Sequence, residues 1–184
     1  REPFALVLYD NHSDMQPPEF PGMISCGDWA GDVIIRNPYL KQVILTGPEQ
    51  KTIDEIPSVF HKKLICISRE EIEEKRVHEK IPLIDMDLPI YISIDKDVLD
   101  RSSARTNWDQ GEMPFPVLEK LLLEVFEHQQ VIGADICGEC SLLEPFRELM
   151  ADEEINKITN DRMYHFLNDC LRTSRNFSTG FEKT

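Results

Sequence analysis

Long apolar runs and glycine are both scarce in this chain of 184 residues, which has 8 Gly and 12 Pro. No apolar stretch approaches the roughly 20 residues that a transmembrane helix needs, which excludes a membrane-spanning protein. Gly and Pro are too few for a collagen-like or low-complexity chain. Hydrophobic residues make up 41% and charged residues 29%, the balance of a globular domain with a substantial core.

Basic residues are also in short supply, with 20 Lys and Arg against 34 Asp and Glu, for a net charge of −14. Such a field repels polyanions, and the basic residues are scattered, so we expect no nucleic-acid partner. Divalent cations or cationic substrates suit this charge better, although most of the carboxylates are expected to be solvated surface groups.

The cysteines lack the even count and regular spacing of a disulfide framework. We therefore expect reduced thiols in a cytoplasmic protein. The opening Arg1-Glu2-Pro3 has no initiator Met and no signal-peptide pattern, which leaves open a missing upstream segment. The five cysteines are Cys26, Cys66, Cys137, Cys140 and Cys170.

Short apolar segments alternate with segments of helical spacing along the whole chain. This alternation predicts one α/β domain over residues 1–184, a three-layer α/β/α sandwich around a mainly parallel sheet. The predicted strands are Phe4–Tyr9, Gln42–Leu45, Lys63–Ile67, Leu88–Ile94 and Val131–Cys137. The predicted helices follow Asp28, span Glu70–Lys80, begin at Pro116 and cover 155–171.

Two predicted strands run directly into clusters of carboxylates. The first reads Asp10-Asn11-His12-Ser13-Asp14, and the second reads Asp95-Lys96-Asp97-Val98-Leu99-Asp100. Ligands of α/β folds gather at the carboxyl ends of strands. If the backbone stays extended, alternate side chains share a face, so Lys96 points away while five side chains converge. These five are Asp10, His12, Asp14, Asp95 and Asp97.

A divalent metal is the simplest way to balance such a cluster, because protonation at pH 7 would need large pKa shifts. Mixed carboxylate and imidazole ligands suit Mn²⁺, with Fe²⁺ and Zn²⁺ as alternatives, and carboxylates can bridge two ions. Either motif alone could be an exposed loop. Their pairing after two buried strands favours a metal site.

The first motif resembles the Asp-Ala-His-x-Asp motif of the ureohydrolases (arginase, agmatinase and formimidoylglutamase). Ser93-Ile94-Asp95-Lys96-Asp97-Val98-Leu99-Asp100 is similar to their Ser-x-Asp-x-Asp-x-x-Asp-Pro motif, and Gly111-Glu112-Met113 is similar to their Gly-Gly-Leu/Met. The resemblance covers most of the chain and implies an arginase-like fold.

The resemblance also implies a site with two Mn²⁺ ions. Asp10 and Asp95 would bridge both ions, His12 and Asp97 would complete one shell, and Asp14 would belong to the other. In that family a metal-bridging hydroxide attacks an amidino or guanidino carbon and expels an amine. Asp14 would orient this nucleophile as a catalytic residue.

The chain departs from the family pattern at three places. A further His ligand of the family precedes the first motif, and this chain begins too late to contain it. Cys26-Gly27 stands where arginases carry His-Gly, and Arg101 replaces the Pro after the second motif.

Two features downstream leave alternatives open. Glu139 matches the family's substrate-binding Glu after a one-residue shift, and it could equally be a solvated loop acid. Cys137-Gly138-Glu139-Cys140 is a lone Cys-x-x-Cys without a thioredoxin-like context or further zinc ligands, so ordinary thiols are the preferred interpretation. Trp29 and Trp108 are expected to pack in the core rather than line a pocket.

These observations predict a manganese-dependent hydrolase of C–N bonds in linear amidines, with a small guanidino or amidino substrate. The alternatives are a diverged arginase-like metal-binding or interaction protein without activity, and a redox protein using Cys-x-x-Cys. Arginine, agmatine, formiminoglutamate and guanidino acids all remain open as substrates. Family members commonly form trimers or hexamers, so the resemblance also allows a homo-oligomer.

Overall fold

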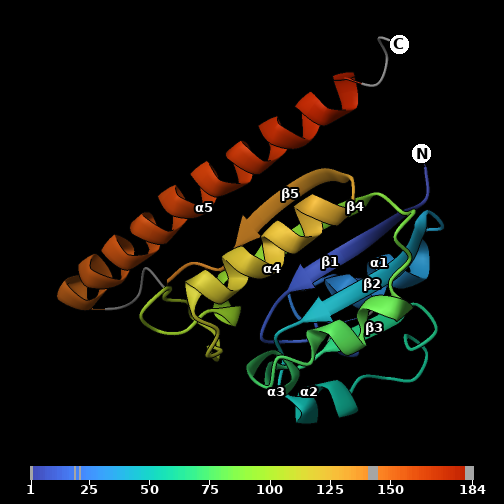
Figure 1. Ribbon diagram of the computed structural model, residues 1–184. Coiled ribbons are helices and arrows are strands. Elements are labelled where there is room, and N and C mark those ends of the chain that lie inside the picture. Colours follow the sequence, from blue (N-terminus) through green and yellow to red (C-terminus); the bar gives the residue numbers. More distant parts are fainter. Residues whose placement is uncertain (1, 19, 21, 141–144, 181–184) are drawn as a thin grey trace.

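Five strands form one sheet at the centre of the computed structural model, which describes residues 2–18, 20, 22–140 and 145–180, with side chains up to Thr173 (Figure 1). Every neighbouring pair is parallel, and the strand order is β3-β2-β1-β4-β5. The strands are β1 (Phe4–Tyr9), β2 (Leu40–Thr46), β3 (Leu64–Ile67), β4 (Ile90–Asp95) and β5 (Val131–Cys137).

The strand order reverses between β1 and β4. From β1 the chain moves outward to β2 and β3, and it then returns to the other side of β1 to add β4 and β5. Tyr9 is paired with Thr46 of β2 on one side and with Ile94 of β4 on the other. Asp10 directly follows β1 and Asp95 is the last residue of β4, so both lie at the strand ends that flank the reversal, where doubly wound sheets bind ligands.

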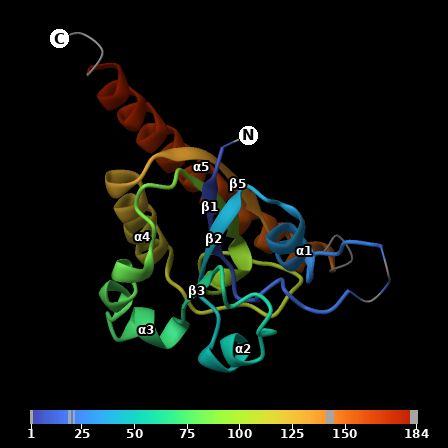
Figure 2. The ribbon, with the colours of Figure 1, turned by 90° about the vertical axis from the view of Figure 1, so that its right-hand side faces the viewer.

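Helices cover both faces of the sheet, so the predicted three-layer sandwich is confirmed (Figure 2). One face packs α1 against Leu6 and Leu8 of β1, and the other packs α4 and α5 against Val7 and Ile92. This division follows the alternation of side chains along a strand. The helices are α1 (Trp29–Arg36), α2 (Gln50–Asp54), α3 (Arg69–Glu73), α4 (Phe115–His128) and α5 (Phe146–Gly180).

The long helix α5 docks on α4 through a few side chains in its middle. Met163 of α5 is fully buried in the same core cluster as Leu118 of α4. Arg162 pairs with Glu119 and places its guanidinium carbon 4.4 Å from the centroid of the Phe115 ring. Beyond this contact the last turns of α5 extend past the sheet (Figure 1).

The prediction of one helix over Glu70–Lys80 is wrong. Ser68 and Glu71 form a capping box that starts α3, but the helix ends after five residues. Lys75 then takes a left-handed conformation with φ of 58°, which a continuing helix does not allow, and a short 3₁₀ helix follows at Val77–Glu79.

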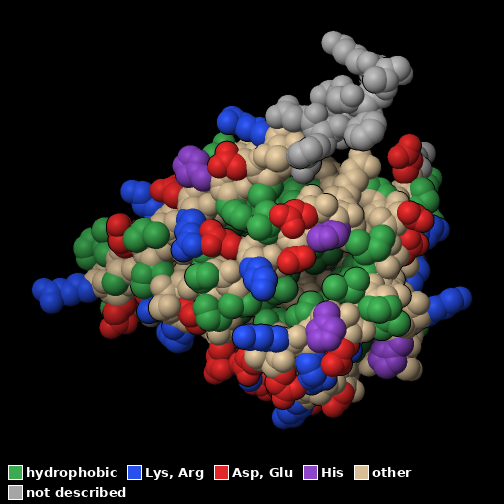
Figure 3. All heavy atoms as spheres, viewed as in Figure 1, with side chains coloured by type: hydrophobic (Ala, Val, Ile, Leu, Met, Phe, Trp, Pro, Cys, Tyr) green, Lys and Arg blue, Asp and Glu red, His purple; other side chains and the backbone are tan. Residues whose placement is uncertain are grey.

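The surface mixes charges of both signs. On the face shown in Figure 3, acidic side chains gather at the lower end, around α2 and α3, with basic side chains among them and over the rest of the face. Within the described part of the chain, no helix combines the length and apolarity needed to cross a bilayer.

We expect Ile92→Ala to lower the free energy of unfolding by about 2–5 kcal/mol, because it leaves a cavity under the strand that carries Asp95. Ile92 is fully buried in the centre of β4, whereas Ile35 on α1 is 67% exposed. Ile35→Ala is the matched control and should change stability by less than about 0.5 kcal/mol. Urea unfolding of both variants measures the difference, and equal losses would contradict this account of the core.

Candidate metal centre

The first carboxylate motif begins where β1 ends. Asp10 is only 2% exposed, and its Oδ1 accepts a hydrogen bond of 2.6 Å from the backbone N–H of His12. Asp14 has a φ of 52°, a left-handed conformation that turns the chain back. The extended backbone expected for residues 10–14 is therefore wrong, because the chain bends at Asn11, His12 and Asp14.

The second motif also leaves the extended conformation. Asp95 ends β4 and caps a 3₁₀ helix at Lys96–Val98, since its Oδ1 accepts a hydrogen bond of 2.9 Å from the backbone N–H of Asp97. Alternation is thus the wrong reason for the placement of Lys96. Its Nζ nevertheless points away from the cluster and lies 2.6 Å from Oε1 of Glu139, which follows β5, and 2.9 Å from Oδ1 of Asn160 on α5.

The two motifs meet through His12 and Asp97. Nδ1 of His12 donates to Oδ2 of Asp97 at 2.7 Å and lies 3.6 Å from Oδ1 of Asp10. The backbone N–H of Asn11 donates to the other oxygen of Asp97 at 3.0 Å. One donor atom each from Asp10, His12 and Asp97 lies within 4.8 Å of the other two, which is compact enough to surround an ion.

Asp14 and Asp95 border this group and interact with it electrostatically. Oδ2 of Asp14 accepts a hydrogen bond of 2.6 Å from the indole Nε1 of Trp29, which begins α1. The structure thus brings all five predicted ligands into one region. Three of them form the compact group, and two extend it.

Burial and the proximity of other carboxylates disfavour the ionised forms of three carboxylates at the site. Burial, followed by the neighbouring Asp97 and Asp14, raises the pKa of Asp10 well above its usual value. Burial also raises the pKa of Asp14 to about 6 and lifts that of Asp95. Hydrogen bonds to Asp10 and Asp97 raise the pKa of His12 to about 10. Such a field favours a bound cation.

The donor set fits a divalent ion. Carboxylate oxygens with one imidazole suit Mn²⁺, Fe²⁺ or Zn²⁺. The backbone also shields the site closely, because a Cβ atom on Gly138 would lie 2.4 Å from Oδ1 of Asp95. Gly111 donates its backbone N–H to the carbonyl of Asp97 at 2.6 Å and holds the second motif in place.

Glu139 is already engaged by the protein. Its Oε1 accepts hydrogen bonds from Lys96 and Asn160, and its Oε2 accepts one of 3.0 Å from Asn156. Partial burial opposes these contacts, yet they hold the pKa of Glu139 below its usual range. A cationic substrate that uses this carboxylate must compete with Lys96.

Some neighbours of the site were not predicted from the sequence. Trp108 is 55% exposed and sets its ring edge-on to His12 with 6.5 Å between centroids, so its assignment to the core is wrong. Asn156 and Asn160 reach Glu139 from α5, and nothing local in the sequence marks them. Their i, i+4 spacing on one helical face is the one signal available.

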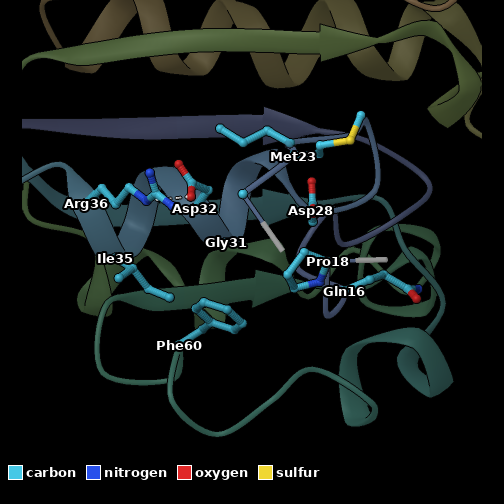
Figure 4. Close-up of a pocket in the computed structure, with 11 residues that line it drawn as sticks. Gln16, Pro18, Met23, Asp28, Gly31, Asp32, Ile35, Arg36 and Phe60 are labelled. Atoms are coloured by element: carbon cyan, nitrogen blue, oxygen red, sulfur yellow. Dashed lines mark ion pairs between the residues drawn. The ribbon is translucent and has the colours of Figure 1, made fainter. Parts of the chain in front are cut away.

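Other candidate positions lie apart from the cluster. Cys26 is exposed, and the exposed Glu124, Glu127 and His128 on α4 form a group that solvent surrounds. A hollow of about 250 Å³ between the 16–28 loop and α1 is bordered by Phe60 and Ile35, with an ion pair between Arg36 and Asp32 (Figure 4). None of the predicted ligands lines it.

Comparison with known proteins identifies the family. The model of the arginase family matches residues 1–140. The chain belongs to the arginase family. The ureohydrolase resemblance is thereby confirmed.

Individual relatives agree with this assignment. An uncharacterised protein of Thermotoga maritima is 32% identical over 159 residues, which cover 85% of this chain and 56% of that protein. The fold is also similar to formimidoylglutamase of Bacillus subtilis (TM-score 0.67, 21% identity, 92% of this chain and 53% of that one). Formiminoglutamase of Trypanosoma cruzi, solved with Mn²⁺, gives a TM-score of 0.65 at 14% identity, over 93% and 57% of the two chains. The chain spans about half the length of these relatives.

We expect Gly138→Ala to disturb both stability and metal binding in this arginase-family chain. Gly138 has a φ of 84°, and the added Cβ would press on Oδ1 of Asp95 and the backbone nitrogen of Lys96. The left-handed conformation alone costs about 1 kcal/mol for alanine. Gly27→Ala is the control, because nothing lies within 4 Å of its Cβ. Calorimetric Mn²⁺ titration should show weaker binding only for the Gly138 variant, and equal affinities would refute the contact.

We expect Glu139→Ala to lower the free energy of unfolding by about 1–3 kcal/mol, because it leaves the ammonium of Lys96 without its charged partner. Lys96 is fully buried, whereas the side chain of Glu139 is 60% exposed, so water moderates the loss. Glu139→Gln keeps an acceptor and should lose less. Chemical unfolding compares the variants, and an unchanged stability for Glu139→Ala would show that the pair contributes little.

Proposed function

We propose that this chain is a divalent-metal-dependent hydrolase of C–N bonds in linear amidines, either guanidino or formimino compounds. The observation that carries the proposal is the meeting of Asp10, His12 and Asp97 donor atoms within 4.8 Å at the strand reversal of an arginase-family fold. Hydrolase chemistry and the amidine substrate class are both inferred from the family, and the acidic charge of the site agrees with a cationic substrate.

Five side chains would hold the metal. Asp10, His12 and Asp97 form the compact group, and Asp14 and Asp95 extend it far enough to serve a second ion. We expect two Mn²⁺ ions, which carboxylates can bridge. When bound, such ions supply a water molecule that is nucleophilic near neutral pH.

The protein's own groups orient the reaction. The indole N–H of Trp29 donates to Oδ2 of Asp14 and holds this carboxylate beside Asp10. Asp14 is therefore fixed beside the ligands, where it can accept a hydrogen bond from the attacking water and later pass a proton to the departing amine. This geometry supports the catalytic role assigned to Asp14.

A cationic substrate suits the surroundings of the cluster. The acidic field attracts amidinium groups, and the exposed Trp108 offers an aromatic wall beside His12 for such a cation. Arginine, agmatine, formiminoglutamate and guanidino acids all carry the required group. A screen of arginine, agmatine, formiminoglutamate and a set of guanidino acids with the metal-loaded chain tests which of them is the substrate.

A second candidate function is metal binding without hydrolysis. The exposed Cys26 stands where arginases carry a histidine, and both oxygens of Glu139 are engaged by neighbours. A chain that binds two ions and releases no amine from any amidine would support this candidate instead.

We expect Asp95→Asn to weaken binding of Mn²⁺ and to abolish hydrolysis, because Asp95 is a predicted bridging ligand. Without metal the variant should be no less stable than the wild type, since the change removes one of several repelling charges. With excess Mn²⁺ the wild type should gain more stability than the variant through ligand linkage. Thermal melts with chelator measure the stability without metal, and melts with excess Mn²⁺ measure the stability gained from metal binding.

Asp109→Asn is the matched control, because the side chain of Asp109 is exposed and lies next to the site. Asn11 contacts the backbone carbonyl of Asp109 and not its carboxylate, so the substitution keeps this hydrogen bond. It should show the full Mn²⁺-induced shift of the wild type. Equal shifts in the Asp95 and Asp109 variants would refute the metal centre, as would metal analysis that finds no bound ion.

A further inference from the structure

The thiol of Cys137 lies beside the proposed metal centre. Cys137 ends β5 and is paired with Asp95 at the end of β4. Its Sγ lies 3.3 Å from Oδ2 of Asp95 and 3.6 Å from the carbonyl oxygen of Ile94. The side chain is exposed, so an ion from solvent can reach it.

The two oxygens of Asp95 have different surroundings. Oδ1 accepts the backbone N–H of Asp97 and is covered by Gly138. Oδ2 faces the thiol instead and has no backbone donor among the described residues. The oxygen best placed to bind an ion is therefore the one that shares its space with Sγ.

The distance between these two atoms suits a shared ion. A metal bonded to sulfur at about 2.3 Å and to oxygen at about 2.1 Å separates the two ligand atoms by about 3.1–3.6 Å, for angles from octahedral to tetrahedral. The observed 3.3 Å lies within this range. Both atoms can bind one ion without a large movement of either strand.

We propose that Cys137 is a thiolate ligand of the metal centre, bonded to the same ion as Oδ2 of Asp95. The inference rests on the proposed metal centre and deepens it. As the sulfur–metal bond forms, the thiol proton passes to solvent, and no electron transfer is involved. A thiolate favours softer ions. With Cys137 as a ligand, the preference of the site for Zn²⁺, Co²⁺ or Fe²⁺ over Mn²⁺ is therefore stronger than with oxygen and imidazole ligands alone.

The other thiol of the Cys-x-x-Cys segment is not part of this arrangement. Gly138 turns the chain with a φ of 84°, and Cys140 then faces the acidic groups of Glu139, Asp152 and Glu153. Cys140 therefore serves as the matched control, because Cys140→Ser removes a thiol of the same segment on the other side of the turn.

Cobalt titration of the full chain tests the proposal. A thiolate bound to Co²⁺ adds an intense near-ultraviolet charge-transfer band, whereas oxygen and nitrogen ligands give only weak visible bands. We expect the intense band in the wild type and in Cys140→Ser, and its loss in Cys137→Ser and Cys137→Ala. The serine variant keeps a hydroxyl donor for Asp95, so a role in hydrogen bonding alone would leave its metal binding unchanged.

Competition with Mn²⁺ gives a second readout. Cys137→Ser should lower the affinity for Zn²⁺ by at least about tenfold, as loss of a partner in a metal site commonly does, and should lower that for Mn²⁺ by less. Thermal melts without metal check that each variant folds like the wild type.

The outcomes separate this inference from the proposed function. If all variants bind Co²⁺ and none shows the intense band, Cys137 is not a ligand and the metal centre stands without it. If the band persists in Cys137→Ser and disappears in Cys140→Ser, the assignment to Cys137 is overturned. If the wild type binds no Co²⁺, Zn²⁺ or Mn²⁺, the proposed function fails together with this inference.

Discussion

The parallel pairing of β1 with β4 is the constraint on which the site depends. Asp10 and Asp95 are 85 positions apart in the chain, and only this pairing places them at neighbouring strand ends. The apolar side chains of both strands provide the energy for it, since they are buried against helices on both faces. The core therefore stabilises an arrangement of like charges that would not form by itself.

Several contacts limit the cost of that arrangement. Asp95 and Asp10 each accept a nearby backbone N–H, Asn11 donates to Asp97, and the indole of Trp29 holds Asp14. Each donor stabilises the charged form of its carboxylate, but burial still leaves the pKa values of Asp10, Asp14 and Asp95 raised. The protein provides orientation for these groups, and under the proposed function a bound cation would provide most of the neutralisation.

The sequence predicted the fold well, because strands and helices depend on local patterns. It also marked five side chains that the fold brings into one region, and their role as metal ligands stays a prediction. Apolar runs marked Phe4–Tyr9 and Val131–Cys137 as strands with the bounds observed. The backbone conformation that brings the proposed ligands together was predicted wrongly. The positive φ of Asp14 and the 3₁₀ helix after Asp95 produce no periodic pattern of apolar residues in the sequence. The partners of Lys96 could not be predicted either, because Asn160 lies 64 residues away and only tertiary packing brings it near.

The buried ammonium of Lys96 also has a consequence for cooperativity. It lies in the chain between two predicted ligands, Asp95 and Asp97, while its charge is satisfied by Glu139 and by Asn160 of α5. The contacts of Lys96 therefore stabilise both the docking of α5 and the conformation of the 3₁₀ helix. Because the two share these contacts, stabilising one of them also stabilises the other. An ion that orders the ligand loop should therefore slow hydrogen exchange in the middle of α5, so that a helix with no ligand of its own reports the occupancy of the site.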